Sequence, residues 1–526
     1  MGARARARAP SFPLKRAPMN VILIVLDTLN RTYLTPYGAK NAPEIQTPNF
    51  DRLARKCVTM DSHWAGSFPT MPTRHELLAG RHEYPWRFWG PLEPFDLTIP
   101  QLAAKQNVVS MLITDTYHYF LEGSGNYHTD FSGYEFLRGH ESDHWITAPI
   151  EPPFEYRRML AERKYGRAEC NYMRNSAHRR DERDFYGPRV MDCAARWLDD
   201  NHTHTRFFLM VDSFDPHEPW HVPPPYDRMY DPDYMGEYSV WRAYGPTAGM
   251  NAREVQKIRA QYMGKITMLD KWMGLVLDRM DRYDLWDNTM LIVTTDHGNC
   301  IGEHDYIGKN YPILWDIVMH IPLFIWMPGM KLKPGTKSKL LTSQIDIYPT
   351  ILQALDCKIP ADYVHHGYSL IPALKGRAQA IRSIAHGGHC GMSSYVTDGR
   401  WVLHKMPATA ENQPYYEYGI NMEGFHKRSV EPYVGAETGQ FLPYTPATVY
   451  RVHKQRSMTG FNNSEKGAIG DLLFELRTGD ADLRLNRIEQ QPKVADRLRR
   501  QLAEEYQRLQ VPAEQYERLG LVDFMS

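Results

Sequence analysis

The stretch Asn20–Asp27 reads NVILIVLD, an unbroken apolar run that ends in an acid. Such a run is typical of a strand buried on both faces of a parallel sheet. Comparable runs follow at Val108–Asp115, Arg206–Asp212, Met290–Asp296 and Pro322–Pro328, and helical patterns lie between them at Pro48–Cys57, Pro188–Asp199, Ala252–Tyr283 and Gln344–Asp356. This alternation predicts an α/β fold with a doubly wound, mostly parallel sheet flanked by helices.

The pattern changes after about residue 375, where segments become short and rich in Tyr, Gly and Pro. Strand-like runs occur at Trp401–His404 and Leu473–Leu476, and a charged helical pattern covers Pro492–Leu509. We therefore expect three parts: a flexible N-terminal extension at 1–18, a main α/β domain at 19–375, and a smaller C-terminal α+β subdomain with a terminal helix at 376–526.

Composition excludes several classes of protein. The 526 residues include 62 basic and 62 acidic side chains, so no global field attracts nucleic acid or an anionic membrane. No apolar run approaches the roughly 20 residues that span a bilayer. The six cysteines are scattered without a C-x-x-C pair, which fits a reducing compartment. We expect a cytoplasmic protein whose partners are neither nucleic acid nor membrane.

The acids that end the apolar runs mark a candidate site, because ligands of open α/β sheets bind beyond the carboxyl ends of the strands. Asp27 is the first, although an Asp in this place is more often a helix cap or a turn residue. In Thr70–Arg81 (TMPTRHELLAGR), a hydroxyl stands four residues before Arg74. This spacing suits a nucleophile and an anion clamp at a helix start, and the alternative is an ordinary capped helix.

Two further segments carry candidate residues. Asp296 and His297 leave an apolar run and offer one oxygen and one nitrogen ligand to a divalent ion. Gly298 allows a tight turn behind them, and Lys309 supplies a positive charge for an anion. His217 lies in a proline-rich loop, which suits a substrate contact or a general acid. A polar surface turn is the alternative for both segments.

The order of these segments is more specific than any one of them. Asp27, the T-x-P-T-R-x-x-L-L-A-G-R run, the P-H-E-P loop and T-D-H-G…G-E-H…K together resemble the sulfatase family of the alkaline phosphatase superfamily. Thr47–Leu53 and Ile345–Thr350 agree with it, and the resemblance extends from about residue 20 to residue 510. It implies an alkaline-phosphatase-like fold and an ester hydrolase whose partner is a small anionic ester.

The resemblance also implies a metal shell. Asp27, Asp296, His297 and the Thr70 oxygen match the family's ligands for one divalent ion (Mn, Mg or Ca), and a two-zinc site is the less favoured alternative. Sulfatases carry a Cys, converted to formylglycine, where this chain has Thr70. The family's paired acids appear here as Asp27-Thr28, and its Lys-x-His as Thr116-Tyr117-His118.

Thr70 is then the expected nucleophile. Arg74 and Lys309 are expected to bind the transferring group, His217 to protonate the leaving oxygen, and His118 and His304 to contact substrate. A formylglycine hydrate expels sulfate by collapsing to an aldehyde, which Thr70 cannot do.

We therefore expect hydrolysis of phosphate diesters or phosphonate monoesters, as in the phosphonate monoester hydrolase and phosphodiesterase branch. The alternatives are a sulfatase that uses unmodified Thr, an inactive binding protein, and a transferase. A homo-oligomer is left open.

Overall fold

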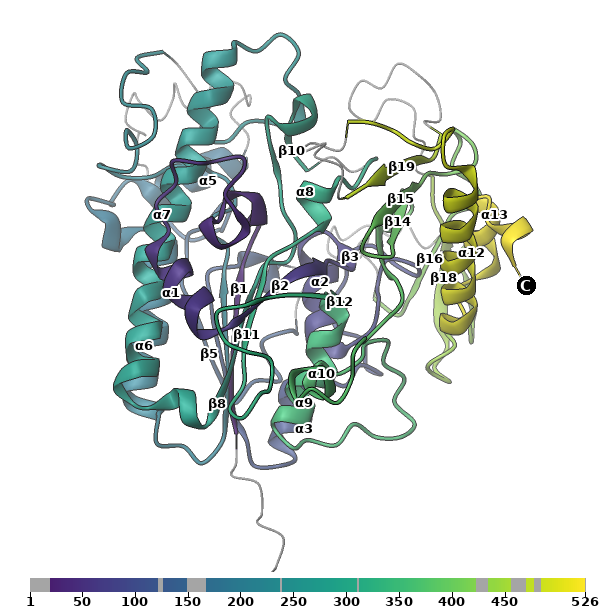
Figure 1. Ribbon diagram of the computed structural model, residues 1–526, viewed down its shortest axis with the longest axis horizontal. Helices are drawn as coiled ribbons and strands as arrows, with labels where there is room; N and C mark the ends of the chain where they lie inside the picture. Colours follow the sequence, from purple (N-terminus) through teal and green to yellow (C-terminus); the bar gives the residue numbers. More distant parts are fainter. Residues whose placement is uncertain are drawn as a thin grey trace, which may run out of the picture.

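The structure is a computed structural model that describes residues 19–121, 126–148, 167–236, 239–309, 312–421, 434–455, 470–476 and 484–525. The predicted extension at 1–18 lies outside this part of the chain. The main element is an eight-stranded sheet with the order β12-β2-β11-β8-β1-β6-β4-β5 (Figure 1). Its strands are β1 (Asn20–Leu26), β2 (Val58–Trp64), β4 (Val109–Thr114), β5 (Gly133–Phe136), β6 (Phe207–Ser213), β8 (Thr289–Thr294), β11 (Leu323–Trp326) and β12 (Lys337–Ser343).

The sheet is mixed but mostly parallel. Strand β1 lies between β6 and β8 and is parallel to both, and β4 is parallel to β6 and β5. Only β11 runs antiparallel to its neighbours, β2 and β8. The five predicted strands are confirmed as β1, β4, β6, β8 and β11, whereas β2, β5 and β12 were not foreseen.

Helices cover both faces of this sheet, as the unbroken apolar runs predict. Ile22 and Ile24 of β1 join one core with the helices α1 (Pro48–Lys56), α6 (Tyr186–Asn201) and α7 (Ala252–Arg282). Val21 and Leu23 join a second core with α2 (Thr70–Ala79), α3 (Ile99–Ala104), α9 (Ile347–Ala354) and α10 (Ile371–Leu374). The helix expected at 344–356 is a short 3-10 turn, η7 (Gln344–Asp346), followed by α9.

A second sheet of five strands has the order β19-β15-β14-β13-β3 and carries the long helix α12 (Pro492–Leu509), on the right of Figure 1. Its strands are β3 (Ser67–Phe68), β13 (Ala385–His389), β14 (Ser394–Thr397), β15 (Trp401–Lys405) and β19 (Leu472–Glu475). Strand β3 pairs with β13 and directly precedes α2, so the second sheet helps to hold the start of that helix.

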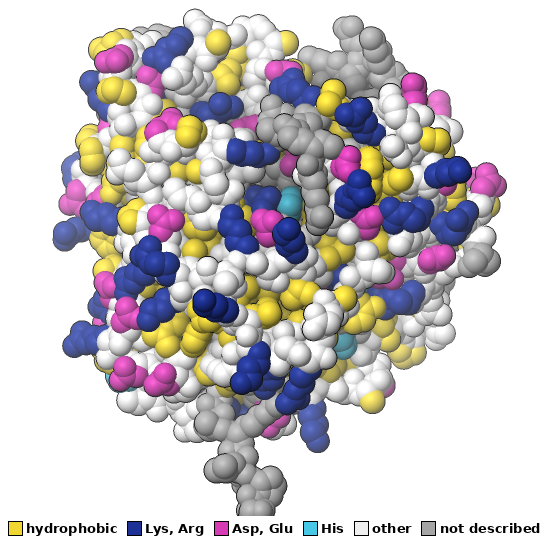
Figure 2. Space-filling view, in the orientation of Figure 1, with side chains coloured by type: hydrophobic (Ala, Val, Ile, Leu, Met, Phe, Trp, Pro, Cys, Tyr) yellow, Lys and Arg dark blue, Asp and Glu magenta, His cyan; other side chains and the backbone are white. Residues whose placement is uncertain are grey.

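The other elements are short. They are β7 (Gly245–Pro246), β9 (Cys300–Ile301), β10 (Tyr306–Gly308), β16 (Tyr416–Gly419), β17 (Glu437–Gly439), β18 (Val449–His453), α5 (Arg167–Ser176), α8 (Asp316–Met319) and α13 (Ala513–Arg518). Among the described helices, none is both long and apolar enough to span a membrane. On the face in Figure 2, basic and acidic side chains are interspersed and form no continuous patch of either sign.

Candidate active site

The carboxyl ends of three neighbouring strands bring the predicted acids together. Asp27 follows β1, Asp296 and His297 follow β8, and Asp212 lies in β6. Because β1 pairs with both other strands, these ends meet at one edge of the sheet. All four side chains are fully buried.

The start of α2 faces this edge of the sheet. Thr70 is the first residue of α2, as the sequence predicts, and Arg74 follows one turn later on the same face of the helix. Both side chains are buried. The positive end of the helix dipole therefore lies at the Thr70 hydroxyl.

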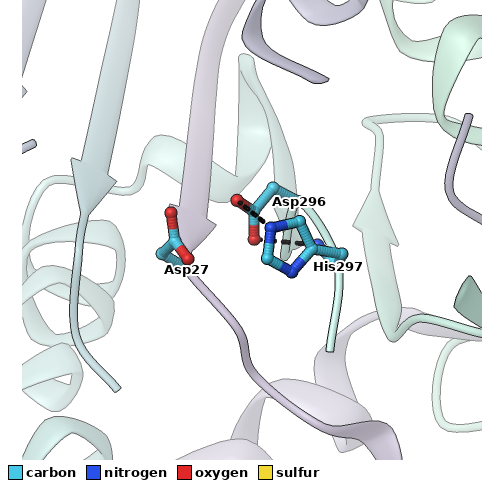
Figure 3. A group of neighbouring side chains, drawn as sticks. All are labelled: Asp27, Asp296 and His297. Atoms are coloured by element: carbon cyan, nitrogen blue, oxygen red, sulfur yellow. Dashed lines mark hydrogen bonds and ion pairs between the residues drawn. The ribbon is translucent and has the colours of Figure 1, made fainter. Parts of the chain in front are cut away.

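Asp27, Asp296 and His297 form a group that suits a divalent metal (Figure 3). Their ligand atoms all lie within 4.8 Å of one another. Oδ1 of Asp27 is buried and has no hydrogen-bond partner within the described part of the chain, and Oδ2 has the Arg74 guanidinium 3.0 Å away. Nδ1 of His297 lies 3.0 Å from the Gly298 carbonyl, so Nδ1–H donates there and Nε2 keeps its lone pair. Two carboxylates and one imidazole fit Mg, Mn or Ca.

The charges of this group also favour a cation. Burial and the Asp296 charge raise the pKa of Asp27 well above its usual range, which favours its protonated form. Burial opposes ionisation of Asp296 as well, but the Arg74 and Lys309 charges hold the pKa of that carboxyl below its ordinary value. Burial lowers the pKa of His297 to about 3, so its imidazole is neutral. A divalent ion would take the place of the Asp27 proton.

Arg74 is saturated by protein acceptors. Its Nε and Nη2 donate to the two Asp212 oxygens at 3.2 and 2.8 Å, and Nη2 lies 3.0 Å from Asp27 Oδ2. Its Nη1 donates to Asp296 and, at 3.3 Å, to the Thr70 carbonyl. A guanidinium has five N–H donors, and these contacts use all of them. The geometry shows Arg74 organising the acids around Thr70, and its contacts give no support to the predicted anion clamp.

Lys309 faces the nucleophile candidate instead. It follows β10, it is buried, and its Nζ donates to the Thr70 hydroxyl oxygen at 3.3 Å. Burial raises the pKa of Glu218 in spite of the nearby Lys309 charge, whereas His118 and Lys309 hold the pKa of Glu141 below its ordinary value against the effect of burial. Lys309 is therefore placed to meet an anion bound at Thr70.

His217 lies near Lys309 and is a neutral imidazole. Its Nδ1 lies 2.7 Å from the Glu218 carbonyl, so Nδ1 carries the proton. Burial and the Lys309 charge lower the pKa of His217 well below its usual value. An imidazole in this state presents a lone pair at Nε2 and suits an acceptor better than the predicted proton donor.

The two other predicted histidines lie in different surroundings. His118 Nε2 lies 3.3 Å from Glu141 Oε2, and its ring packs edge-on against Phe214, which in turn contacts the His217 ring. The His304 ring instead stacks on Trp315 at 3.9 Å, next to the second sheet. The structure thus brings His118 near His217, with Phe214 between them, and groups His304 with aromatic residues.

Two backbone features position the ligands. Thr28 adopts a left-handed conformation (φ 58°) that turns its N–H onto Asp296 Oδ1 at 3.0 Å. Gly298 does not adopt positive φ. A Cβ there would instead lie 2.0 Å from the Ile317 carbonyl, so close approach of two backbones demands glycine.

A second buried group, Asp115, His140 and Asp215, also has metal-ligand character. Lys265 Nζ lies 2.7 Å from Asp215 Oδ1 and already supplies a positive charge to it. A two-zinc site would need further ligands of this kind, but His386, another buried histidine, lies in β13 and contacts the Tyr84 hydroxyl at 2.8 Å. These contacts do not favour the two-zinc alternative.

Comparisons with known proteins identify the family of this chain. The sequence pattern of the sulfatase family matches residues 19–357. Human iduronate 2-sulfatase is 24% identical over 68% of this chain and 69% of its own. The multifunctional alkaline phosphatase superfamily protein PehA of Trinickia caryophylli is 25% identical over 74% of this chain and 82% of its own.

A solved phosphonate monoester hydrolase of Agrobacterium radiobacter superposes with a TM-score of 0.64 at 19% identity, covering 93% of this chain and 96% of the other. The expected alkaline-phosphatase-like α/β fold is thereby confirmed. The chain belongs to the sulfatase family of the alkaline phosphatase superfamily and is an ester hydrolase.

Proposed function

We propose that this protein is a metal-dependent hydrolase of phosphate diesters or phosphonate monoesters that works through a covalent Thr70 intermediate. The observation that carries the proposal is the Thr70 hydroxyl at the start of α2, 3.3 Å from Lys309 Nζ and beside the Asp27, Asp296 and His297 group. A divalent ion held by that group would supply a Lewis acid that lowers the pKa of an oxygen bound to it.

The charges near Thr70 support a substrate with a single negative charge. Arg74 is neutralised by the acids around it, so Lys309 is the cation that the protein directs at the Thr70 hydroxyl. Phosphate diesters, phosphonate monoesters and sulfate esters are monoanions, whereas phosphate monoesters are dianions near neutral pH. We expect phosphate monoesters to be the poorest of these substrates.

The identity of the nucleophile favours phosphorus over sulfur chemistry. The Thr70 oxygen, after losing its proton to solvent, attacks phosphorus, and the bond to the leaving oxygen breaks with its electron pair on that oxygen. Water then attacks the same phosphorus and releases Thr70. A single hydroxyl offers no route through an aldehyde, so the covalent ester must be cleaved at phosphorus or sulfur. The solved phosphonate monoester hydrolase of similar fold supports phosphorus.

Sulfate ester hydrolysis by unmodified Thr70 is the second candidate. The family pattern and the similarity to iduronate 2-sulfatase favour it. Sulfate esters carry the same single charge, so the charges near Thr70 do not separate the two candidates.

The test is turnover by the purified protein with added Mn of four aryl esters: a phosphodiester, a phosphonate monoester, a sulfate and a phosphate monoester. Each is compared with Thr70→Ala, and intact mass spectrometry checks for an adduct in the wild type. We expect the wild type to turn over the phosphonate monoester and the phosphodiester. We expect Thr70→Ala to lower kcat by at least about 1,000-fold, on the order of losses seen for catalytic nucleophiles.

Turnover of the sulfate alone would establish the second candidate. Turnover that survives Thr70→Ala would overturn the covalent mechanism. Absence of turnover with all four esters, together with failure to bind Mn, would favour the inactive alternative.

A further inference from the structure

The part of the mechanism that the predicted residues leave unassigned is the proton for the leaving oxygen. His217 carries its proton on Nδ1, which already contacts the Glu218 carbonyl at 2.7 Å. A donor to substrate must instead hold a proton on a nitrogen that faces no protein acceptor. His118 has that arrangement.

His118 is held through one nitrogen and leaves the other for a ligand. Its Nε2 lies 3.3 Å from Glu141 Oε2. Its Nδ1 is buried and has no hydrogen-bond partner within the described residues. The ring is fixed by an edge-on contact with Trp89 at 5.2 Å and by Phe214 at 5.4 Å. A carboxylate on one side of an imidazole stabilises the imidazolium, and this form can donate from the other side.

Glu141 is itself held in place. It follows β5 and has a left-handed backbone (φ 47°), which is uncommon for a residue with a side chain. The Tyr117 hydroxyl bonds to it, and the Ser142 hydroxyl donates to Tyr117 at 2.7 Å. Burial opposes its charge, yet His118 and Lys309 hold the pKa of Glu141 below its ordinary value. The carboxylate is therefore ionised beside His118.

We infer that Glu141 is a positioning residue that holds His118 as the proton donor to the leaving oxygen, an inference that rests on the proposed function. As the bond from phosphorus to the leaving oxygen breaks, the Nδ1 proton of the His118 imidazolium moves to that oxygen and a neutral alcohol departs. In the second half, the water that attacks phosphorus gives a proton to His118, and the Thr70–phosphorus bond breaks with its electron pair on the Thr70 oxygen.

The experiment measures kcat and KM of Glu141→Gln on a series of aryl phosphonate monoesters whose leaving phenols range from strongly to weakly acidic. A weakly acidic phenol depends on the proton donor, whereas p-nitrophenol does not. We expect kcat to fall by about 100-fold for the least acidic phenol and by less than about 3-fold for p-nitrophenol, with KM unchanged. Glu135→Gln, the same change at an exposed position of β5, is the matched control and leaves kcat unchanged.

Two further variants separate positioning from damage to the fold. His118→Ala gives the same dependence on the leaving group, and the double variant with Glu141→Gln is no slower than His118→Ala alone, because the two residues act as one unit. Glu141→Asp keeps the carboxylate and restores part of the lost rate on the weakly acidic phenols.

Equal losses across all leaving groups, or losses that multiply in the double variant, would overturn the inference. If such losses are found while the wild type turns the esters over and Thr70→Ala does not, only the role of Glu141 is removed and the proposed function stands. If the wild type turns over no phosphorus ester, the proposed function fails and the inference fails with it.

Discussion

Replacing Asp212 by Asn tests whether the buried ion pairs of Arg74 stabilise the fold and the metal-ligand group. Asp212 accepts from Arg74 at 2.8 and 3.2 Å and from the Tyr119 hydroxyl at 2.5 Å, all in the fully buried interior. The substitution keeps the shape but removes the charge, and it leaves the guanidinium with Asp296 and with Asp27, whose raised pKa favours the neutral form. Breaking a buried ion pair from one side costs about 3–5 kcal/mol of unfolding free energy.

The chain offers a matched control in Asp199. This carboxylate accepts from the Arg279 Nε and Nη2 at 3.1 and 2.9 Å and from the Tyr283 hydroxyl at 2.8 Å, the same three kinds of donor. The pair differs in exposure, with 29% of the Asp199 side chain and 23% of the Arg279 side chain accessible. Solvent screens such a pair, so Asp199→Asn is expected to cost about 1 kcal/mol or less.

Urea unfolding followed by tryptophan fluorescence compares the two variants with the wild type. We expect the midpoint of Asp212→Asn to fall clearly below that of Asp199→Asn, and its Mn affinity to fall by about 10–100-fold, as for residues that orient ligands. Equal midpoints for the two variants would refute the view that burial makes the Arg74 cluster a structural requirement of the site.

Three other outcomes are expected. Gly298→Ala places a Cβ 2.0 Å from the Ile317 carbonyl and should weaken Mn binding by calorimetry at least 10-fold, whereas Gly245→Ala, with open space around it, should not. The His404 ring nitrogens lack hydrogen-bond partners within the described residues, and burial lowers the pKa of His404 to about 3. Since the unfolded value is about 6.5, the wild type loses stability as pH falls through this window, and the advantage of His404→Leu in urea unfolding should grow from pH 7.5 to pH 5 and not stay constant. Chelation with EDTA should lower the melting temperature of the wild type, with recovery on adding Mn, and should leave Asp296→Asn unchanged.

The sequence predicts a strand correctly where that strand is buried on both faces of the sheet. The run in Asn20–Leu26 has no polar position, and the structure packs its alternate residues into two separate cores. Strands β2 and β12 were not predicted, because their sequences VTMDSHW and KSKLLTS mix apolar with polar and charged residues and are only partly buried. The antiparallel direction of β11 follows from tertiary pairing with β2 and β8, which local sequence does not encode.

The site was predictable to the extent that strand ends and motif order define it. Both the strand ends and the motif order identify Asp27, Asp296 and His297. The strand ends alone identify Asp212, which ends an apolar run. Glu141 neither ends an apolar run nor belongs to a family motif. It lies in a loop after β5, and its contact with His118 forms only when that loop packs against η3 (Tyr117–Phe120). Contacts between loops far apart in sequence leave no periodic signal.

Arg74 shows how spacing can identify a functional residue and leave its task open. The T-x-P-T-R spacing places Thr70 and Arg74 on one face of α2, and this holds equally for an anion clamp and for a residue that organises acids. Arg74→Lys distinguishes the two, because an ammonium has three donors and cannot replace five in a fixed fork. If Arg74 organises the acids, Mn affinity falls by about 10–100-fold and KM, measured at saturating Mn, changes by less than about 3-fold. If Arg74 is an anion clamp, the variant shows the reverse: KM for the anionic ester rises and Mn affinity is kept. That result would show that Arg74 binds the substrate.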